Sequence, residues 1–193
     1  MDAVILYAHP NPASFNNAIK DTVIDTFKKK GKSFSLRDLY SMNFNPVLTG
    51  RQLYDIYVNS KVEDDVKQEQ EIISQAKLLI VIHPIWWSGM PAILKGYIDR
   101  VFTYGFAYKE ENGDVVGLLK DKKVLIINTF GADEKELNQF GIKDCFDKIY
   151  HSIYGFCGIK EIKTKFLFAV THVSDEDRKK MLEEVIEFVE ENL

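Results

Sequence analysis

The segment KLLIVIHPIWWSGMPAILKGYIDRVFTYGFAY, residues 77–108, determines how the rest of the chain is interpreted. It begins with an apolar run at residues 78–82, bounded by His83-Pro84, that is typical of a buried strand. Two tryptophans, a Ser-Gly turn and Pro91 follow, and apolar residues then recur at helical spacing. The pattern predicts a strand, an aromatic loop and a helix. The loop lies at the carboxyl end of the strand, where open α/β sheets bind ligands.

The tryptophans of this loop, Trp86 and Trp87, are too large for both to point inward. At least one is expected to line a groove, and their position beside a proline at a strand end favours a planar ligand. Ordinary packing is the alternative, because aromatic side chains contribute heavily to protein cores.

The composition indicates a single domain spanning residues 1–193. A chain of 193 residues that is 46% hydrophobic can bury a full core, and no change in composition divides it. The formal net charge of -4 argues against a general nucleic-acid-binding or anionic-membrane surface. No apolar run approaches the roughly 18 residues of a membrane-spanning helix, so a soluble, cytoplasmic protein without membrane insertion is expected.

The cysteines and histidines do not predict a metal site. Cys145 and Cys157 do not form a CxxC pair and are expected to be small buried hydrophobic residues. None of the four histidines lies four residues from another, which removes the simplest argument for zinc.

Further strands and helices alternate along the chain. Apolar or alternating patterns predict strands at residues 3–8, 33–39, 124–128 and 163–170. Helices are expected after Ser14 and Ser174, which are good N-caps, at about residues 65–75, and within residues 134–154. Residues 40–65 show no clear period and are predicted to be an irregular cover, and residues 109–123 a surface excursion with an Asn-Gly turn.

Nearly unbroken apolar strands between helices indicate an α/β fold with a mostly parallel sheet covered on both faces. Five strands in the order 2-1-3-4-5 bring the ends of the first, third and fourth strands together. These ends offer a helix N-terminus for a phosphate after Ser14, tryptophans for a flat ring, and Asn128 and Thr129 for hydrogen bonds to the ring edge. A flavin fits all three, whereas GxGxxG, P-loop and GxSxG motifs are absent.

The chain closely resembles the NAD(P)H:quinone oxidoreductases, the DT-diaphorase-like flavoproteins that include relatives of modulator of drug activity B. The matching stretches are His9, SFN at 14–16, DLYSMNFNP at 38–46, PIWWSGMPAILKGYIDRVF at 84–102, GFAY at 105–108 and FCG at 156–158. The resemblance implies a flavodoxin-like three-layer αβα sandwich, tightly bound FAD and a homodimer with shared active sites. It also implies ping-pong transfer of a hydride from NAD(P)H through flavin N5 to a quinone-like acceptor.

The resemblance also implies which residues form the site, although no catalytic side chain is assigned. The flavin would be held by His9, Ser14, Phe15, Asn16, Pro84, Ile85, Trp86, Trp87, Ser88, Asn128, Thr129 and Gly131. Trp87, with Tyr108 and Phe156 of the partner subunit, would frame the place where nicotinamide and quinone stack in turn.

The chain departs from the family pattern at three places. Where the family usually has Thr-Thr-Gly-Gly, Phe130 follows Asn128-Thr129 and is expected to narrow the substrate space. The segment after it lacks the tyrosine and histidine that some members place near the reduced flavin, and Lys143 is interpreted as an exposed helix lysine. Glu110 replaces a second tyrosine. The alternatives are a flavin-binding regulatory partner of the potassium-efflux type, or an FMN-dependent electron carrier or reductase.

Overall fold

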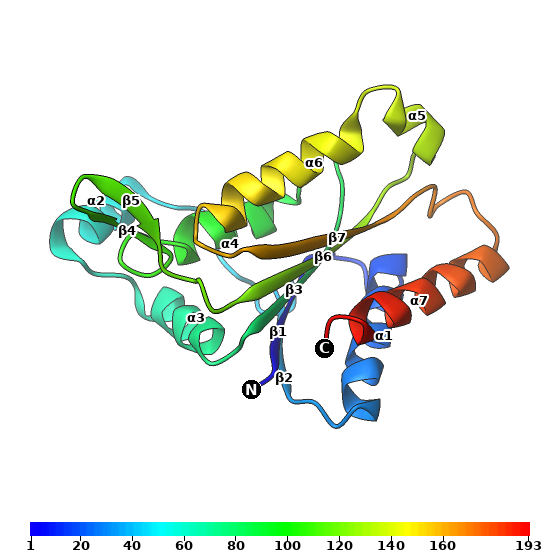
Figure 1. Ribbon diagram of the computed structural model, residues 1–193, viewed down its shortest axis with the longest axis horizontal. Coiled ribbons are helices and arrows are strands. Elements are labelled where there is room, and N and C mark those ends of the chain that lie inside the picture. The colour runs from blue at the N-terminus through cyan, green and yellow to red at the C-terminus, as the bar shows by residue number, and fades with distance from the viewer.

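A computed structural model covers residues 1–193 and contains a five-stranded parallel sheet (Figure 1). Its strands, in the spatial order β2-β1-β3-β6-β7, are β1 (Ala3–Tyr7), β2 (Phe34–Asp38), β3 (Leu78–Pro84), β6 (Lys123–Thr129) and β7 (Glu161–Leu167). Since β6 and β7 are the fourth and fifth strands of this sheet, the predicted order 2-1-3-4-5 is confirmed.

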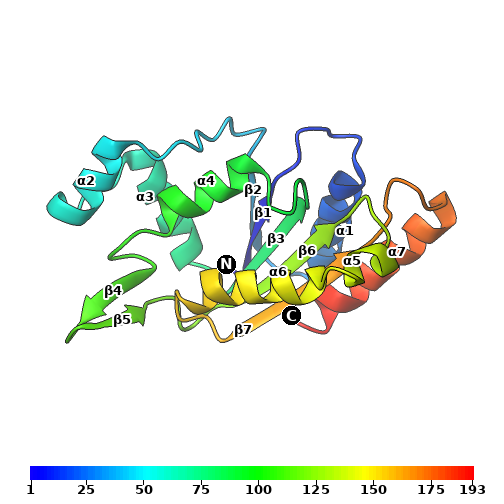
Figure 2. The ribbon, with the colours of Figure 1, turned by 90° about the horizontal axis from the view of Figure 1, so that it is seen from above.

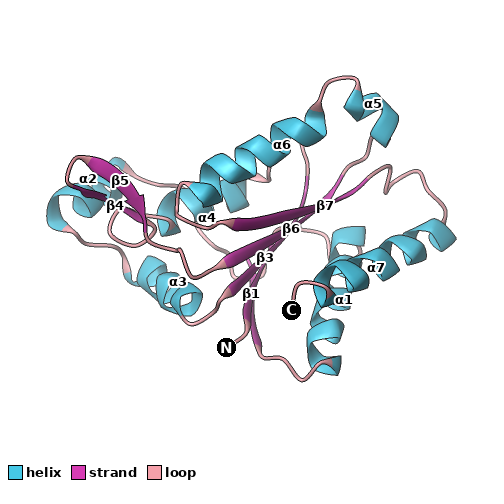
Figure 3. Cartoon of the chain, viewed as in Figure 1, coloured by secondary structure: helices cyan, strands magenta, loops and turns pink.

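Helices cover both faces of the sheet and complete three layers (Figures 2 and 3). One face packs against α1 (Phe15–Lys29) and α7 (Asp175–Glu190), and the other against α3 (Asp64–Ser74), α4 (Ala92–Val101) and α6 (Ile142–Tyr150). The alternation of side chains explains this, because Ile80 and Ile82 of β3 belong to the first apolar cluster, whereas Leu79 and Val81 belong to the second. The flavodoxin-like arrangement of a parallel sheet between two layers of helices agrees with the sequence analysis.

The predicted helix starts are confirmed at the two serines. The Ser14 hydroxyl accepts a hydrogen bond from the Asn17 amide at 3.1 Å, and the Ser174 hydroxyl accepts one from the Asp177 amide at 3.1 Å. Pro91 is the N-cap of α4, one position earlier than expected. None of the helices combines the length and the apolar character that a membrane-spanning segment requires.

The structure differs from the sequence analysis within residues 40–65. This stretch contains α2 (Gly50–Asn59), which begins with a capping box between Thr49 and Gln52. The predicted Asn-Gly turn is confirmed, and it joins β4 (Tyr108–Glu111) to β5 (Asp114–Gly117) in an antiparallel hairpin. In Figure 1, α2 and the hairpin lie together beyond one end of the sheet.

The segment predicted as one helix within residues 134–154 is divided. It forms the short α5 (Glu134–Asn138), then α6, and finally a π-helical turn, η1 (His151–Gly155), which leads into Phe156. Cys157 is buried as expected, but the prediction for Cys145 is wrong, because this side chain is exposed on α6.

Candidate functional site

A cavity of about 970 Å³ lies at the carboxyl ends of β1, β3, β6 and β7. Its walls come from the loops that leave these strands and from the first turns of α1 and α7. The lining residues are His9, Asn11, Ala13, Ser14, Phe15, Asn16, Ala18, Pro84, Ile85, Trp86, Trp87, Thr129, Gly131, Val170, Thr171 and Arg178. The sequence analysis predicted ten of them as flavin-binding residues.

The first turn of α1 offers hydrogen-bonding groups that nothing in the chain satisfies. The backbone amides of Phe15 and Asn16 have no acceptor, as expected for the first helical residues. The Asn16 amide group donates to the Thr129 hydroxyl at 2.7 Å, and its buried oxygen Oδ1 has no partner. This end of the cavity is therefore suited to an anionic ligand that also carries hydroxyl donors.

The tryptophans stand on a very tight hairpin. Trp86 and Gly89 exchange backbone hydrogen bonds of 2.9 and 3.0 Å, and between them Trp87 and Ser88 have φ values of 49° and 54°. Two consecutive positive φ values are typical of a type I′ turn and are costly for a bulky side chain such as Trp87. The turn leaves the Trp87 ring fully exposed at the rim of the cavity.

His9 lines the same cavity and contacts this loop. Its ring meets the Trp86 ring edge-on, with 5.4 Å between the centroids, and its Nδ1 accepts a hydrogen bond from the Asn11 amide at 3.1 Å. Partial burial lowers the pKa of His9 below its ordinary value, so the imidazole is neutral near pH 7.

The sequence analysis missed the part of the cavity that follows β7. Arg178 of α7 donates to the Val170 carbonyl at 3.0 Å and to the Asp175 carboxylate at 2.6 Å, and it adds a positive charge to the lining. The available signal was the strand order, since β7 ends at the same edge of the sheet as β6.

A buried polar network lies just below the cavity. His83 of β3 is hydrogen-bonded to Asn128 of β6, which accepts a hydrogen bond from Tyr150 of α6. Burial lowers the pKa of His83 to about 4, and burial raises the pKa of the Tyr150 hydroxyl far above its usual range. The Asn128 side chain, predicted at the flavin edge, thus points into the core.

Four other predicted residues lie outside the cavity lining. Phe130 is 4% exposed and packs against Phe166 and Phe168, so its side chain belongs to the core. Tyr108 and Phe156 lie 4.9 Å apart, by ring centroids, on another surface. Their proposed place at the acceptor site stays a prediction. The Ser88 side chain also lies outside the lining.

Tyr108 and Phe156 belong to an exposed aromatic face, which we define as Tyr57, Tyr104, Tyr108 and Phe156. The hydroxyls of Tyr57 and Tyr108 lie 2.6 Å apart, and the Tyr104 ring packs 5.9 Å from Tyr57 and 5.8 Å from Tyr108 by ring centroids. Partial burial and the Tyr57 hydroxyl raise the pKa of Tyr108 to about 12.

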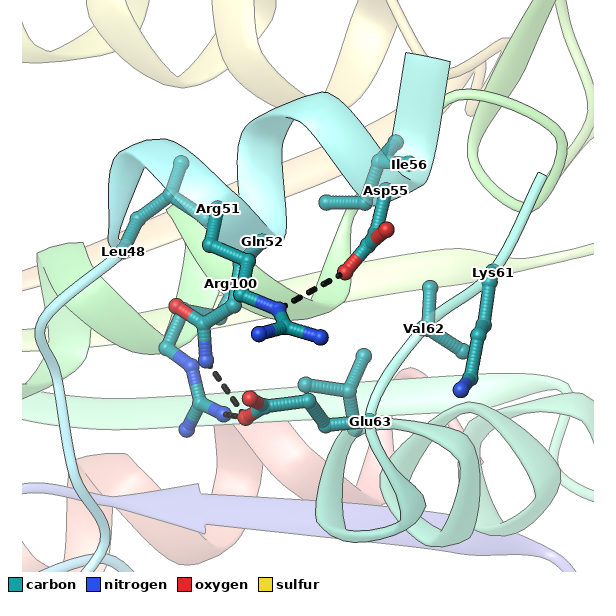
Figure 4. Close-up of a pocket in the computed structure, with 10 residues that line it drawn as sticks. Leu48, Arg51, Gln52, Asp55, Ile56, Lys61, Val62, Glu63 and Arg100 are labelled. Carbon is teal, nitrogen blue, oxygen red and sulfur yellow. Dashed lines mark hydrogen bonds and ion pairs between the residues drawn. The ribbon is translucent and has the colours of Figure 1, made fainter. Parts of the chain in front are cut away.

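A smaller cavity of about 250 Å³ lies between α2 and the first turn of α3 (Figure 4). Most of its charged residues have partners within the lining: Arg51 pairs with Asp55 at 3.7 Å, and Glu63 binds both Gln52 and Arg100. It lacks the aromatic wall of the larger cavity. The pairing joins α2 to α4 and does not indicate a ligand site.

Comparison with known proteins places the chain among flavodoxin-like proteins. Residues 1–191 match the family described as Flavodoxin-like fold. The chain is 38% identical to an uncharacterized NAD(P)H oxidoreductase of Haemophilus influenzae, over 95% of this chain and 91% of that protein. It is 32% identical to ribosyldihydronicotinamide dehydrogenase [quinone] of Rattus norvegicus, over 93% and 86%. The structure of an NAD(P)H:quinone oxidoreductase from Methanothermobacter marburgensis superposes with a TM-score of 0.86, at 30% identity over 98% and 97% of the chains.

Proposed function

Because the chain belongs to the flavodoxin-like fold family, and within it to the NAD(P)H:quinone oxidoreductases, we propose that it reduces quinone-like acceptors with NAD(P)H through bound FAD. The observation that carries the proposal is the cavity at the strand ends. It combines unsatisfied amides at α1, the partnerless Asn16 oxygen and a tryptophan hairpin. These groups match the phosphates, hydroxyls and flat ring of a flavin.

The extent of the cavity supports FAD over FMN. Its lining continues from Trp87 past the start of α1 to Arg178, which is more than a mononucleotide with one phosphate needs. The amides of Phe15 and Asn16 and the Arg178 guanidinium provide positive potential for a diphosphate. Pro84, Ile85 and Trp86 would then lie along the ring, with Thr129 and Gly131 at its edge.

When bound, the flavin would supply two-electron redox chemistry between NAD(P)H and the acceptor. The chain holds the ring, limits access to it and stacks on whichever substrate is present. Trp87 is placed for this stacking, because the hairpin directs its ring away from the core and towards the rim. Since nicotinamide and quinone would use the same place in turn, the kinetics should be ping-pong, with parallel double-reciprocal lines.

The acceptor site is completed by a second copy of the chain in this proposal. The exposed aromatic face adjoins apolar side chains of α2, including Tyr54 and Val58, that are 59% and 60% exposed. Monomers rarely leave such a patch uncovered. A homodimer would bury this face and bring Tyr108 and Phe156 to the partner's cavity. Light scattering after size-exclusion chromatography should give twice the chain mass, and a monomer would contradict this arrangement.

The first test is the absorption spectrum of the purified protein, with chromatography of what it releases on denaturation. Flavin bands with released FAD, and oxidation of NAD(P)H when menadione is added, are the expected results. Released FMN would retain the flavin site and remove the proposed dinucleotide. A colourless protein that does not take up added FAD or FMN would contradict the flavin assignment.

A further inference from the structure

His83, Asn128 and Tyr150 form a closed hydrogen-bonded network that we call the core triad. The Asn128 amide nitrogen lies 2.9 Å from His83 Nε2, and the Tyr150 hydroxyl lies 2.7 Å from the Asn128 amide oxygen. His83 Nδ1 lies 2.9 Å from the Pro84 carbonyl oxygen. The three side chains come from β3, β6 and α6, and each is at most 1% exposed.

The donors and acceptors of the core triad fit in one consistent direction. The Pro84 carbonyl can only accept, so His83 carries its proton on Nδ1 and leaves Nε2 as an acceptor. Asn128 then donates to Nε2 and accepts from the Tyr150 hydroxyl. Every member is satisfied without a charge, which is the condition for a stable buried polar network.

The core triad is linked directly to the cavity wall. The residues that follow His83 and Asn128 are Pro84 and Thr129, which line the cavity and pair with each other between β3 and β6. Successive strand residues face opposite sides of the sheet, so the triad fixes from below the same two strand ends that form the wall above. Thr129 also accepts a hydrogen bond from Asn16 and thus connects this wall to α1.

Packing alone does not explain these side chains. The triad lies in an otherwise apolar cluster, where neighbours such as Val81, Ile126 and Phe146 are hydrophobic. Replacing both partners of a buried hydrogen bond by apolar groups of the same shape is often neutral for stability. Apolar groups, however, cannot form directional hydrogen bonds that link two strand ends to a helix.

We propose that His83, Asn128 and Tyr150 are positioning residues for the flavin site, which hold the Pro84–Gly89 loop and the end of β6 in the arrangement that accepts the ring. They act through Pro84 and Thr129 and do not touch the ligand themselves. The inference rests on the proposed function for the identity of the ligand, but the loop geometry can be measured without any ligand.

The chain offers a specific probe of this loop, since its two tryptophans are Trp86 and Trp87. In the flavin-free protein, Tyr150→Phe should lower the time-resolved tryptophan anisotropy, because the loop gains motion when Asn128 loses a donor. The same change should weaken binding of added FAD by about fivefold, which corresponds to one buried hydrogen bond.

Tyr154→Phe is the matched control. Tyr154 is also 1% exposed and lies one turn further along, in η1, but its hydroxyl makes no hydrogen bond with the triad. It should change neither the anisotropy nor the FAD affinity. A purely structural effect of losing a buried hydroxyl would appear in both variants.

Two substitutions of His83 separate the contacts of its two ring nitrogens. The amide of His83→Gln can reach the position of Nε2 and accept from Asn128, whereas that of His83→Asn can reach only the position of Nδ1 and donate to Pro84. The triad connects the two strands through Asn128. His83→Gln should therefore keep FAD affinity within about twofold of the natural chain, whereas His83→Asn should weaken it about fivefold.

The outcomes distinguish this inference from the proposed function. Equal anisotropy and equal FAD affinity in Tyr150→Phe and Tyr154→Phe would overturn the inference, as would equal effects of Gln and Asn at His83. If the natural chain takes up no flavin while Tyr150→Phe still loosens the tryptophan loop, the triad keeps its positioning role and the proposed function fails.

Discussion

Two buried polar clusters, one around Arg100 and the other the core triad, hold helices in place. The first is charged and the second is neutral. Arg100 of α4 is 1% exposed in its side chain and pairs with Glu63 and Asp65, both at 2.8 Å, outside the lining of the larger cavity. The core triad beneath the cavity contains no charge. The partners of Arg100 keep 55% and 49% of their exposure, so water shares the cost of the charge, whereas His83 and Tyr150 have no contact with water. The Arg100 cluster thus keeps its charges partly in reach of solvent, whereas the network below the larger cavity is neutral.

The contrast predicts different responses to acid. The pKa of His83 is about 4 in the folded chain and ordinarily 6.5. As the pH falls below 6.5, the unfolded chain binds a proton that the folded chain refuses, so stability present above pH 6.5 is lost towards pH 4. The loss in unfolding free energy should be about 3 kcal/mol. Urea denaturation at a series of pH values measures it.

The control for this prediction is His83→Gln, which cannot titrate. Its unfolding free energy should fall less steeply over the same pH range, and the difference between the two curves isolates His83 from the carboxylates. His9 also has a lowered pKa, so His9→Gln serves as a second reference. Parallel curves for the natural chain and His83→Gln would show that the imidazole is not held neutral.

The second prediction concerns the charged cluster. Arg100→Met should lower the unfolding free energy by about 2 kcal/mol, because the Asn45 carbonyl and two carboxylates lose their donor. The effect is below that of a fully buried pair, since Glu63 and Asp65 can rehydrate. FAD affinity should not change. Arg51→Met is the control, because this side chain is 91% exposed and its removal should have almost no effect. A loss of FAD affinity in Arg100→Met would break the distinction between the two clusters.

The sequence was sufficient for the sheet but not for either cluster. Apolar runs such as residues 78–82 determine strands because a parallel sheet buries both faces, and the strand order followed. His83 and Asn128 are 45 residues apart, and their partnership depends on the register of β3 against β6. No local sequence pattern determines the register between these two strands. The contact of Tyr150 with the pair depends in addition on how α6 packs on the sheet.

The missed helix α2 has a different cause. Its Thr49–Gln52 capping box was a readable start signal, but most of its apolar residues are exposed to solvent. Ile56 is buried, whereas Leu53 and Tyr57 are 46% and 55% exposed. When the apolar side chains of a helix point to solvent, their spacing in the sequence does not mark a face that packs on the core. The exposed apolar side of α2 is also the surface that the proposed dimer would cover.

Backbone strain also differs between the region of the Arg100 cluster and the larger cavity. Near the charged cluster, the positive φ values belong to Asn43 and Ser60, at 49° and 51°, whereas at the cavity Trp87 has one of 49°. Asn tolerates this conformation better than Trp. Trp87→Asn should therefore raise the unfolding free energy by about 1 kcal/mol while it raises the KM for menadione. Denaturation and steady-state kinetics on the same preparation test both effects, and a loss of stability would show that the Trp87 ring supports the fold.

The smallest effect is expected at Lys143. Its ammonium group lies 2.9 Å from the Glu134 carboxylate and 5.8 Å from the Phe168 ring, at 41% side-chain exposure. Exposed ion pairs contribute little, so Lys143→Ala should change the unfolding free energy by less than about 0.5 kcal/mol and leave quinone turnover unchanged. Stopped-flow reduction of the bound flavin by NADH is the sensitive measurement. A tenfold slower reduction would mean that the charge of Lys143, outside the neutral core triad, acts on the flavin.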